Sequence, residues 1–276
     1  MDSFRRDGLT FDVRDGGPSD GTPVVLLHGF PQDSTAWNEV APVLHQQGLR
    51  TLAPDQRGYS PMARPHGRAS YRLTETVADL LALLDAAALE SAHVVGHDWG
   101  AAVGWAAAAW HPERVRTLTA LSVPHPAAMQ KALVTSDQGL RSFYMGLFQL
   151  PLLPERLLLA RNGAALRRML LRGGLPERVA DHYVARMREP GALSAALGWY
   201  RALPWSGRDP VGRVHVPTLH VWSTGDAFLG RTATESTSDF CRAGYRLEVL
   251  DGVTHWIPEL AADRVAELVT AHVRSV

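Results

Sequence analysis

The residues Gly96-His97-Asp98-Trp99-Gly100 place a carboxylate between two glycines, directly after the strand-like run Ala92–Val95. Flanking glycines allow a strained turn from a strand into a helix, which lifts the central side chain above the sheet. An aspartate there is ionised at neutral pH, because its ordinary pKa is about 3.9. A carboxylate that attacks a saturated carbon forms a stable ester, which water can then cleave. Asp98 therefore predicts substitution at carbon, at an epoxide or a carbon–halogen bond.

Two further residues could serve Asp98 in the second step. His255 lies between the last predicted strand and the last predicted helix, where a base could activate water. Asp226 follows the predicted strand Thr218–Trp222 and could orient the imidazole and stabilise its charged form. Asp251 is the main rival for this acid, but its place at a strand end, four residues before His255, is more typical of a turn. Another possible place for this acid is directly after the strand ending near Ser122, but the sequence has no carboxylate there.

Hydrolysis of an ester also needs backbone N–H donors for the oxyanion that forms at its carbonyl. The candidate donors are the N–H of Trp99, directly after the nucleophile, and the N–H of Phe30, which precedes Pro31. Pro31 has no N–H and is expected to fix this loop, and a cis peptide bond is one way to do so. We expect structural roles for His28 and His97, with His28 holding the loop through hydrogen bonds.

Short apolar runs alternate with helical patterns on both sides of these residues, which predicts a mostly parallel sheet covered by helices. The alternation stops after Pro124 and resumes near His215, with helical patterns and prolines between them. A helical block inserted between two strands is typical of a cap, so we expect a core domain of residues 1–124 and 215–276 and a helical cap domain of residues 125–214. The expected strands are Leu9–Val13, Val24–Leu27, Arg50–Ala53, Ala92–Val95, Val115–Ser122, Thr218–Trp222 and Arg246–Leu250, and one helix is expected from Ser34 to Gln47.

Composition and charge set further limits. The chain has 276 residues, of which 46% are hydrophobic and 20% charged, and its formal net charge is zero. These values are ordinary for a globular enzyme and indicate neither a nucleic-acid partner nor a membrane. Cys241 is the one cysteine, the first 20 residues lack the apolar centre of a signal peptide, and Ala101–Trp110 is too short to span a bilayer. We expect a cytoplasmic monomer or homodimer that needs no metal and no cofactor.

The chain resembles an epoxide hydrolase of the α/β-hydrolase fold and is similar to the hydrolase domain of soluble epoxide hydrolases. The resemblance covers nearly the whole chain, through His28–Pro31, Asp55–Ser60, Gly96–Gly100, Asp226 and His255-Trp256. The first two motifs are widespread in the superfamily, whereas Gly-His-Asp-Trp-Gly is narrower and points to epoxide hydrolases or haloalkane dehalogenases. The order nucleophile, acid, histidine is also that of α/β-hydrolases.

The inserted block distinguishes between these two families. Tyr144 and the segment after it, up to Pro151, resemble the family stretch that bears the first ring-opening tyrosine, and Trp199-Tyr200-Arg201 resembles the stretch that bears the second. By this resemblance, the phenolic O–H groups of Tyr144 and Tyr200 would bind and protonate the epoxide oxygen, since phenols with a pKa near 10 are protonated at neutral pH. Water would be the second substrate. An apolar pocket for a small apolar epoxide is suggested by Phe30, Trp99, Phe143, Leu147 and Leu150.

Three alternatives remain open at this point. A haloalkane dehalogenase would use the same Asp98 and the indole N–H of Trp99 as a halide donor, but it needs a second donor, often asparagine, where this chain has Phe30. A ligand receptor on the hydrolase fold would bind without turnover, and the complete triad argues against it. An esterase is weaker still, because Asp98 is not a serine.

Overall fold

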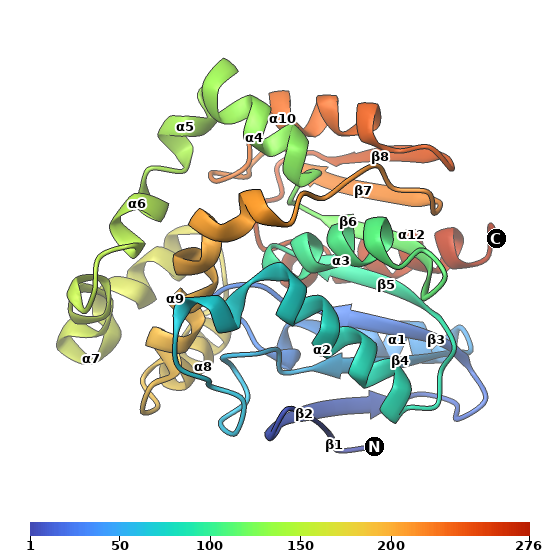
Figure 1. The fold of residues 1–276 in the computed structure, drawn as a ribbon, viewed down its shortest axis with the longest axis horizontal. Helices are drawn as coiled ribbons and strands as arrows, with labels where there is room; N and C mark the ends of the chain where they lie inside the picture. The colour runs from blue at the N-terminus through green and yellow to red at the C-terminus, as the bar shows by residue number, and fades with distance from the viewer.

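A computed structural model describes residues 1–276, apart from the side chain of residue 206. Over the described residues, eight strands form a single sheet in the order β1-β2-β4-β3-β5-β6-β7-β8 (Figure 1). β1 and β2 pair antiparallel, β2 pairs antiparallel with β4, and all other neighbours are parallel. The predicted mostly parallel sheet is therefore confirmed. Its strands are β1 Ser3–Arg6, β2 Leu9–Gly16, β3 Thr22–Leu27, β4 Leu49–Pro54, β5 Ala92–His97, β6 Val115–Leu121, β7 Thr218–Ser223 and β8 Tyr245–Leu250.

Helices cover both faces of the sheet, because successive side chains of each strand point to opposite faces. In β3, Val24 belongs to the apolar cluster under α1 and α12, whereas Val25 belongs to the cluster under α2 and α3. Continuous apolar runs in the central strands are what a sheet buried on both faces requires. The helical elements outside the inserted block are η1 Ser34–Trp37, α1 Val40–Gln46, η2 Arg68–Tyr71, α2 Leu73–Ala86, α3 Trp99–Trp110, α10 Arg231–Ser236, η4 Thr237–Phe240, α11 Ile257–Leu260 and α12 Ala262–Val273.

The block between β6 and β7 is helical, as its sequence pattern predicted. In Figure 1, α6 to α9 lie together beyond the end of the sheet at which β5 leads into α3, while α4 packs against α10 of the core. The elements of this block are α4 Pro126–Thr135, α5 Gln138–Arg141, α6 Tyr144–Phe148, α7 Leu153–Arg172, α8 Glu177–Met187, α9 Ala192–Ala202 and η3 Leu203–Arg208.

Two local expectations were wrong. The strand β1 was not predicted, because its one buried apolar side chain, Phe4, gives no periodic pattern; it stacks on Phe11 of β2 with 4.6 Å between ring centroids. The single helix expected over residues 34–47 is instead a 3₁₀ turn followed by α1. Pro42 explains the interruption, because it has no N–H to donate and its ring crowds the carbonyl four residues earlier.

None of the helices within the described part of the chain is both long enough and apolar enough to cross a bilayer.

Candidate active site

Asp98 occupies a strained turn between β5 and α3. Its φ of 51° lies in the left-handed region, where residues other than glycine are uncommon. The flanking glycines make this turn possible, since a Cβ atom on Gly96 would collide with the backbone of Gly100 and one on Gly100 with the carbonyl of Leu27. The carboxylate thus lies at the N-terminus of α3, where the helix dipole favours negative charge.

The loop after β3 holds a backbone donor against this carboxylate. The N–H of Phe30 donates to Oδ1 of Asp98 at 2.8 Å, and the Phe30-Pro31 peptide bond is cis. Gly29 permits the close approach, because a Cβ atom there would collide with the Asp98 side chain. His28 holds the loop as expected: its Nε2 accepts from the N–H of Gln56 at 3.1 Å. The sequence-predicted donor Trp99 is the first residue of α3.

His255 and Asp226 come together beside Asp98. His255 Nδ1 is 2.8 Å from Asp226 Oδ2, and its Nε2 is 3.6 Å from Asp98 Oδ2. The other oxygen of Asp226 accepts the N–H groups of Phe228 and Leu229 at 2.8 and 3.0 Å, which fixes the carboxylate. The rival acid Asp251 is exposed and accepts a hydrogen bond from the Thr224 hydroxyl, so it takes no part in this cluster.

The charges of these buried groups depend on one another. Burial acts to raise the pKa of Asp98 and of Asp226, but attraction to His255 and the hydrogen bonds that each carboxylate accepts outweigh it, and both pKa values lie below the usual range. Burial acts to lower the pKa of His255, yet the charge and hydrogen bond of Asp226, together with Asp98, raise it to about 10. In the free protein the site therefore holds two carboxylates around one imidazolium.

A buried polar network that sequence reasoning missed supports this arrangement. The side-chain oxygen of Gln32, Oε1, accepts the N–H of Gly29 at 2.9 Å and also lies 2.8 Å from His97 Nδ1. The other ring nitrogen of His97, Nε2, is 2.9 Å from the carbonyl oxygen of His255. Gln32 in turn donates to Glu259 at 2.7 Å, and so does Tyr183 of α8 at 2.8 Å. One network thus ties the Phe30 loop and the His255 loop to α8. No motif in the sequence signals Gln32 or Glu259.

Two tyrosines of the inserted helical block line a cavity of about 410 Å³ together with Asp98. Tyr144 of α6 and Tyr200 of α9 have their ring centroids 6.1 Å apart. Burial, with repulsion from nearby carboxylates, raises the pKa of both phenols, so both remain protonated donors. The residues around this cavity are Phe30, Asp98, Leu140, Arg141, Phe143, Tyr144, Leu147, Phe148, Leu158, Met169, Tyr200, Ala227, Phe228, His255 and Trp256.

The residues expected to form the apolar pocket are only partly brought together. Phe30, Phe143 and Leu147 line the large cavity. Trp99 lines a second cavity of about 190 Å³, which shares Asp98 and the two tyrosines with the first. Leu150 lines neither: its side chain is exposed, and its carbonyl accepts a hydrogen bond from Arg201.

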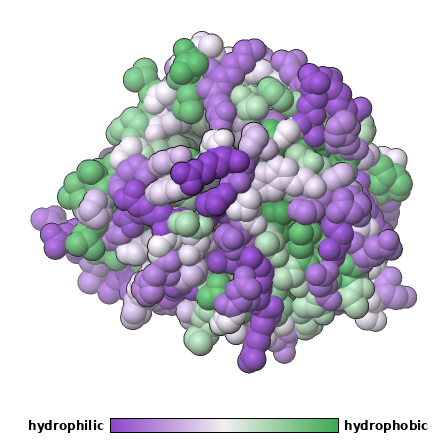
Figure 2. Space-filling view, viewed as in Figure 1, coloured by the Kyte–Doolittle hydropathy of each residue, from purple (hydrophilic) through white to green (hydrophobic). Residues whose placement is uncertain are grey.

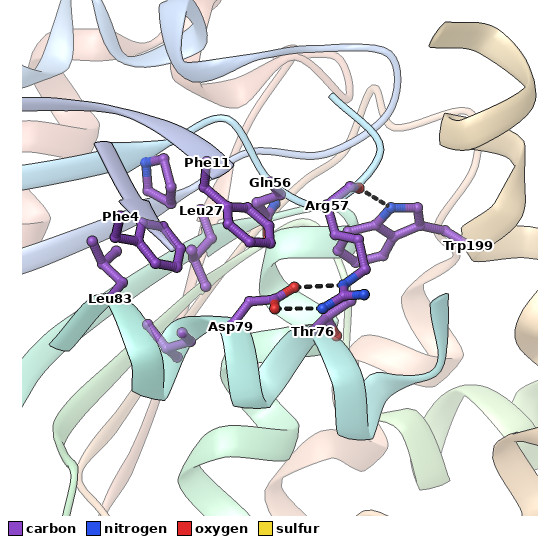
Figure 3. Close-up of a pocket in the computed structure, with 11 residues that line it drawn as sticks. Phe4, Phe11, Leu27, Gln56, Arg57, Thr76, Asp79, Leu83 and Trp199 are labelled. Carbon is purple, nitrogen blue, oxygen red and sulfur yellow. Dashed lines mark hydrogen bonds and ion pairs between the residues drawn. The ribbon is translucent and has the colours of Figure 1, made fainter. Parts of the chain in front are cut away.

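Trp199, which precedes Tyr200 in the sequence, anchors α9 to the core (Figure 3). The indole N–H of Trp199 donates to the carbonyl of Arg57 at 2.8 Å, and the Arg57 guanidinium makes two bonds of 2.6 Å to Asp79 of α2. Arg6 of β1 donates to the same carboxylate at 2.9 Å. Because Arg57 and Asp79 are both buried, this anchor is shielded from water and salt.

Among the residues that the structure describes, no group of three or more His, Cys, Asp and Glu side chains could hold a metal ion.

Comparisons of this chain with a family model, with related sequences and with solved structures agree with one another. A family model described as the alpha/beta hydrolase fold matches residues 22–262. The chain is 35% identical to the AB hydrolase superfamily protein YfhM of Bacillus subtilis, over 97% of this chain and 96% of that protein. It is 32% identical to Epoxide hydrolase A of Mycobacterium tuberculosis, over 91% and 90%. The crystal structure of Epoxide Hydrolase A from Mycobacterium thermoresistibile aligns with a TM-score of 0.85 and 28% identity, over 99% of this chain and 97% of that one.

Proposed function

Because this chain belongs to the epoxide hydrolases of the α/β-hydrolase fold, we propose that it converts a small apolar epoxide into a vicinal diol through a covalent ester on Asp98. The observation that carries the mechanism is the position of the Asp98 carboxylate: it lines the same cavity as His255, Tyr144 and Tyr200. Residues 125–214 act as the cap that brings the two tyrosines over the nucleophile.

In the first step, Oδ2 of Asp98 attacks an epoxide carbon, and the carbon–oxygen bond of the ring breaks. Oδ2 is the attacking atom because Oδ1 is already held by the N–H of Phe30. The electron pair of the broken bond stays on the epoxide oxygen, which takes a proton from Tyr144 or Tyr200. Both phenols are protonated at neutral pH, since their pKa values are raised. The product of this step is a hydroxyalkyl ester.

In the second step, water cleaves the ester. Alkylation removes the negative charge of Asp98, which is one of the two anions that raise the pKa of His255. The pKa of His255 then falls, and its proton returns to the tyrosinate that ring opening left. The neutral imidazole can now take a proton from water, while Asp226 stabilises the cation that forms. Oδ1 becomes the oxyanion, held by the N–H groups of Phe30 and Trp99. Collapse of this intermediate breaks the bond between the carbonyl carbon and Oδ2, and the leaving alkoxide takes the proton of the new carboxyl group, which releases the diol and restores the carboxylate.

A single turnover in ¹⁸O-labelled water, with the enzyme in excess over the epoxide, tests this proposal. The new oxygen of the diol comes from the Asp98 carboxylate, so the first diol formed should be unlabelled, and the label should appear in the protein. Full labelling of the first diol would mean that water attacks the epoxide directly. Parallel assays with haloalkanes, scored for halide release, test the dehalogenase alternative.

A further inference from the structure

The zero net charge of the chain hides a strong separation between its two parts. Residues 125–214 hold 13 of the 28 basic residues and only 6 of the 28 acidic ones, so this block carries +7 and the rest of the chain −7. Much of the excess lies on α7, whose exposed residues include Arg156, Arg161, Arg168 and Arg172. Among the described residues, none of these four arginines forms an ion pair, whereas Glu155 is taken by Arg201. The positive charge of this helix is therefore available to a partner.

Among the described residues, eight of the twelve exposed large apolar side chains lie in the same region. Of the exposed large hydrophobic residues, those on and between α4 and α7 are Leu133, Val134, Leu140, Phe143, Leu150, Leu152, Leu153 and Leu157. In Figure 1 these helices follow one another along one edge of the molecule, and Figure 2 shows green and purple residues side by side along that edge. We call the surface made by α5, α6 and α7 the cap edge; its exposed apolar residues are Leu140, Phe143, Leu150, Leu152, Leu153 and Leu157. Clustered exposed apolar residues mark an interaction surface more often than isolated ones do.

The cap edge borders the catalytic cavity. Leu140 and Phe143 are 78% and 75% exposed, and both line the cavity that contains Asp98. Leu147 and Leu158 continue the apolar lining inward. An apolar molecule held at the cap edge would therefore reach the cavity past apolar side chains.

We propose that the cap edge docks on an anionic lipid surface. Leucine and phenylalanine side chains that enter the interface, beside arginines that meet anionic headgroups, are the combination that holds a protein on such a membrane. Charge complementarity favours anionic lipid over a second copy of the chain, since two identical cap edges would bring like charges together. This docking goes beyond the proposed function, because it requires no reaction at Asp98. It also revises the expectation, drawn from net charge, that a membrane has no role.

Flotation of the full chain with vesicles tests the docking. Vesicles of phosphatidylcholine mixed with phosphatidylglycerol should carry the protein with them, those of phosphatidylcholine alone should not, and high salt should release it. The double variant Arg156→Glu/Arg161→Glu should weaken binding at least about tenfold, because each basic residue near a charged surface contributes about fivefold. The double variant Leu152→Ser/Leu157→Ser should also weaken it, since both leucines are exposed. Neither pair lines the catalytic cavity, so epoxide hydrolysis without vesicles should stay at the parent rate.

The matched control is Arg5→Glu/Val249→Ser, which makes the same kinds of change at exposed positions on β1 and β8, the two edge strands of the sheet. This variant should bind vesicles like the parent. The proposal is overturned if the mixed vesicles carry no protein, or if the control weakens binding as much as the cap-edge variants do. It is also overturned if sedimentation shows a dimer that the leucine variant dissociates and that does not bind vesicles.

Discussion

His255 lies closer to its acid than to the nucleophile: its Nδ1 is 2.8 Å from Asp226 Oδ2, but its Nε2 is 3.6 Å from Asp98 Oδ2. The shorter distance is a hydrogen bond, whereas the longer one allows only charge attraction. Asp98 is therefore not committed to the imidazole, and its carboxylate can reach a substrate unaided. In the proposed mechanism, His255 is needed only when water attacks the ester.

From this geometry we predict that the His255→Gln variant forms the ester but cannot release it. Glutamine occupies a similar volume but cannot take a proton from water, so ring opening should persist while hydrolysis slows by a factor of about 10² or more. Intact-protein mass spectrometry after addition of an epoxide should show an adduct with the mass of the substrate. A His255→Gln enzyme with full turnover would remove this residue from the mechanism.

The Asp226→Ala variant should accumulate the same adduct, though less completely, because His255 would remain but lose its anchor. Asp251→Ala is the matched control, since Asp251 is exposed and bonds only to the Thr224 hydroxyl in the described structure. The control should turn over like the parent. If instead Asp251→Ala accumulated the adduct and Asp226→Ala did not, the acid would have been assigned to the wrong residue.

The two steps should respond differently to acid. The pKa of Asp98 lies below its usual range, so alkylation should continue as the pH falls until that pKa is reached. Hydrolysis instead needs neutral His255, and in the ester only Asp226 still raises the pKa of the imidazole. As the pH falls through that pKa, hydrolysis should be lost first. A pH of about 5 lies below the ordinary histidine pKa of about 6.5. Rapid quenching during turnover at this pH should therefore trap more ester than the same quench at neutral pH. Equal amounts of ester at both pH values would contradict the assignment of His255 as base.

Much of this site was predictable because its chemistry depends on residue type and on places where strands end. The two glycines around Asp98 and the loop positions of Asp226 and His255 can be seen directly in the sequence. The hydrogen bond between Gln32 and Glu259 could not be predicted, because the two residues are 227 positions apart and neither belongs to a pattern. Leu150 was misplaced for a related reason: spacing alone does not determine which way a side chain points just after α6, a helix of five residues.

Removal of the Tyr144 and Tyr200 hydroxyls should separate ring opening from ester hydrolysis. Ring opening places negative charge on an oxygen, and a lost donor of this kind costs on the order of 3 kcal/mol, or roughly a hundredfold in rate. Tyr144→Phe and Tyr200→Phe should each slow alkylation by about that factor, and the double variant should be nearly inactive although folded. Stopped-flow measurement of ester formation checks this prediction.

Tyr71→Phe is the control for these variants, because Tyr71 is also buried but its hydroxyl donates to the carbonyl of Pro65 at 2.8 Å, and it does not line the cavity. It should open epoxides near the parent rate. A dehalogenase would barely respond to either tyrosine change and would lose activity with Trp99→Phe. If the Tyr144/Tyr200 double variant made diol at the parent rate, both hydroxyls would be structural.

The anchor between Arg57 and Asp79 should matter for stability and, through Trp199, for the position of Tyr200. Asp79→Asn leaves a buried guanidinium without its main anion, and breaking such a pair costs about 3–5 kcal/mol, so the melting temperature should fall clearly. Asp181→Asn, which breaks the exposed pair with Arg167, should change the melting temperature little.

Trp199→Phe keeps an aromatic ring but loses the N–H that donates to the carbonyl of Arg57. Trp199 does not line the large cavity, so this variant should lower kcat more than it raises KM. The reason is that α9 would hold the Tyr200 hydroxyl less well at the moment of ring opening. A Trp199→Phe enzyme with the parent kcat and only a lower melting temperature would show that the anchor supports the fold and not the chemistry.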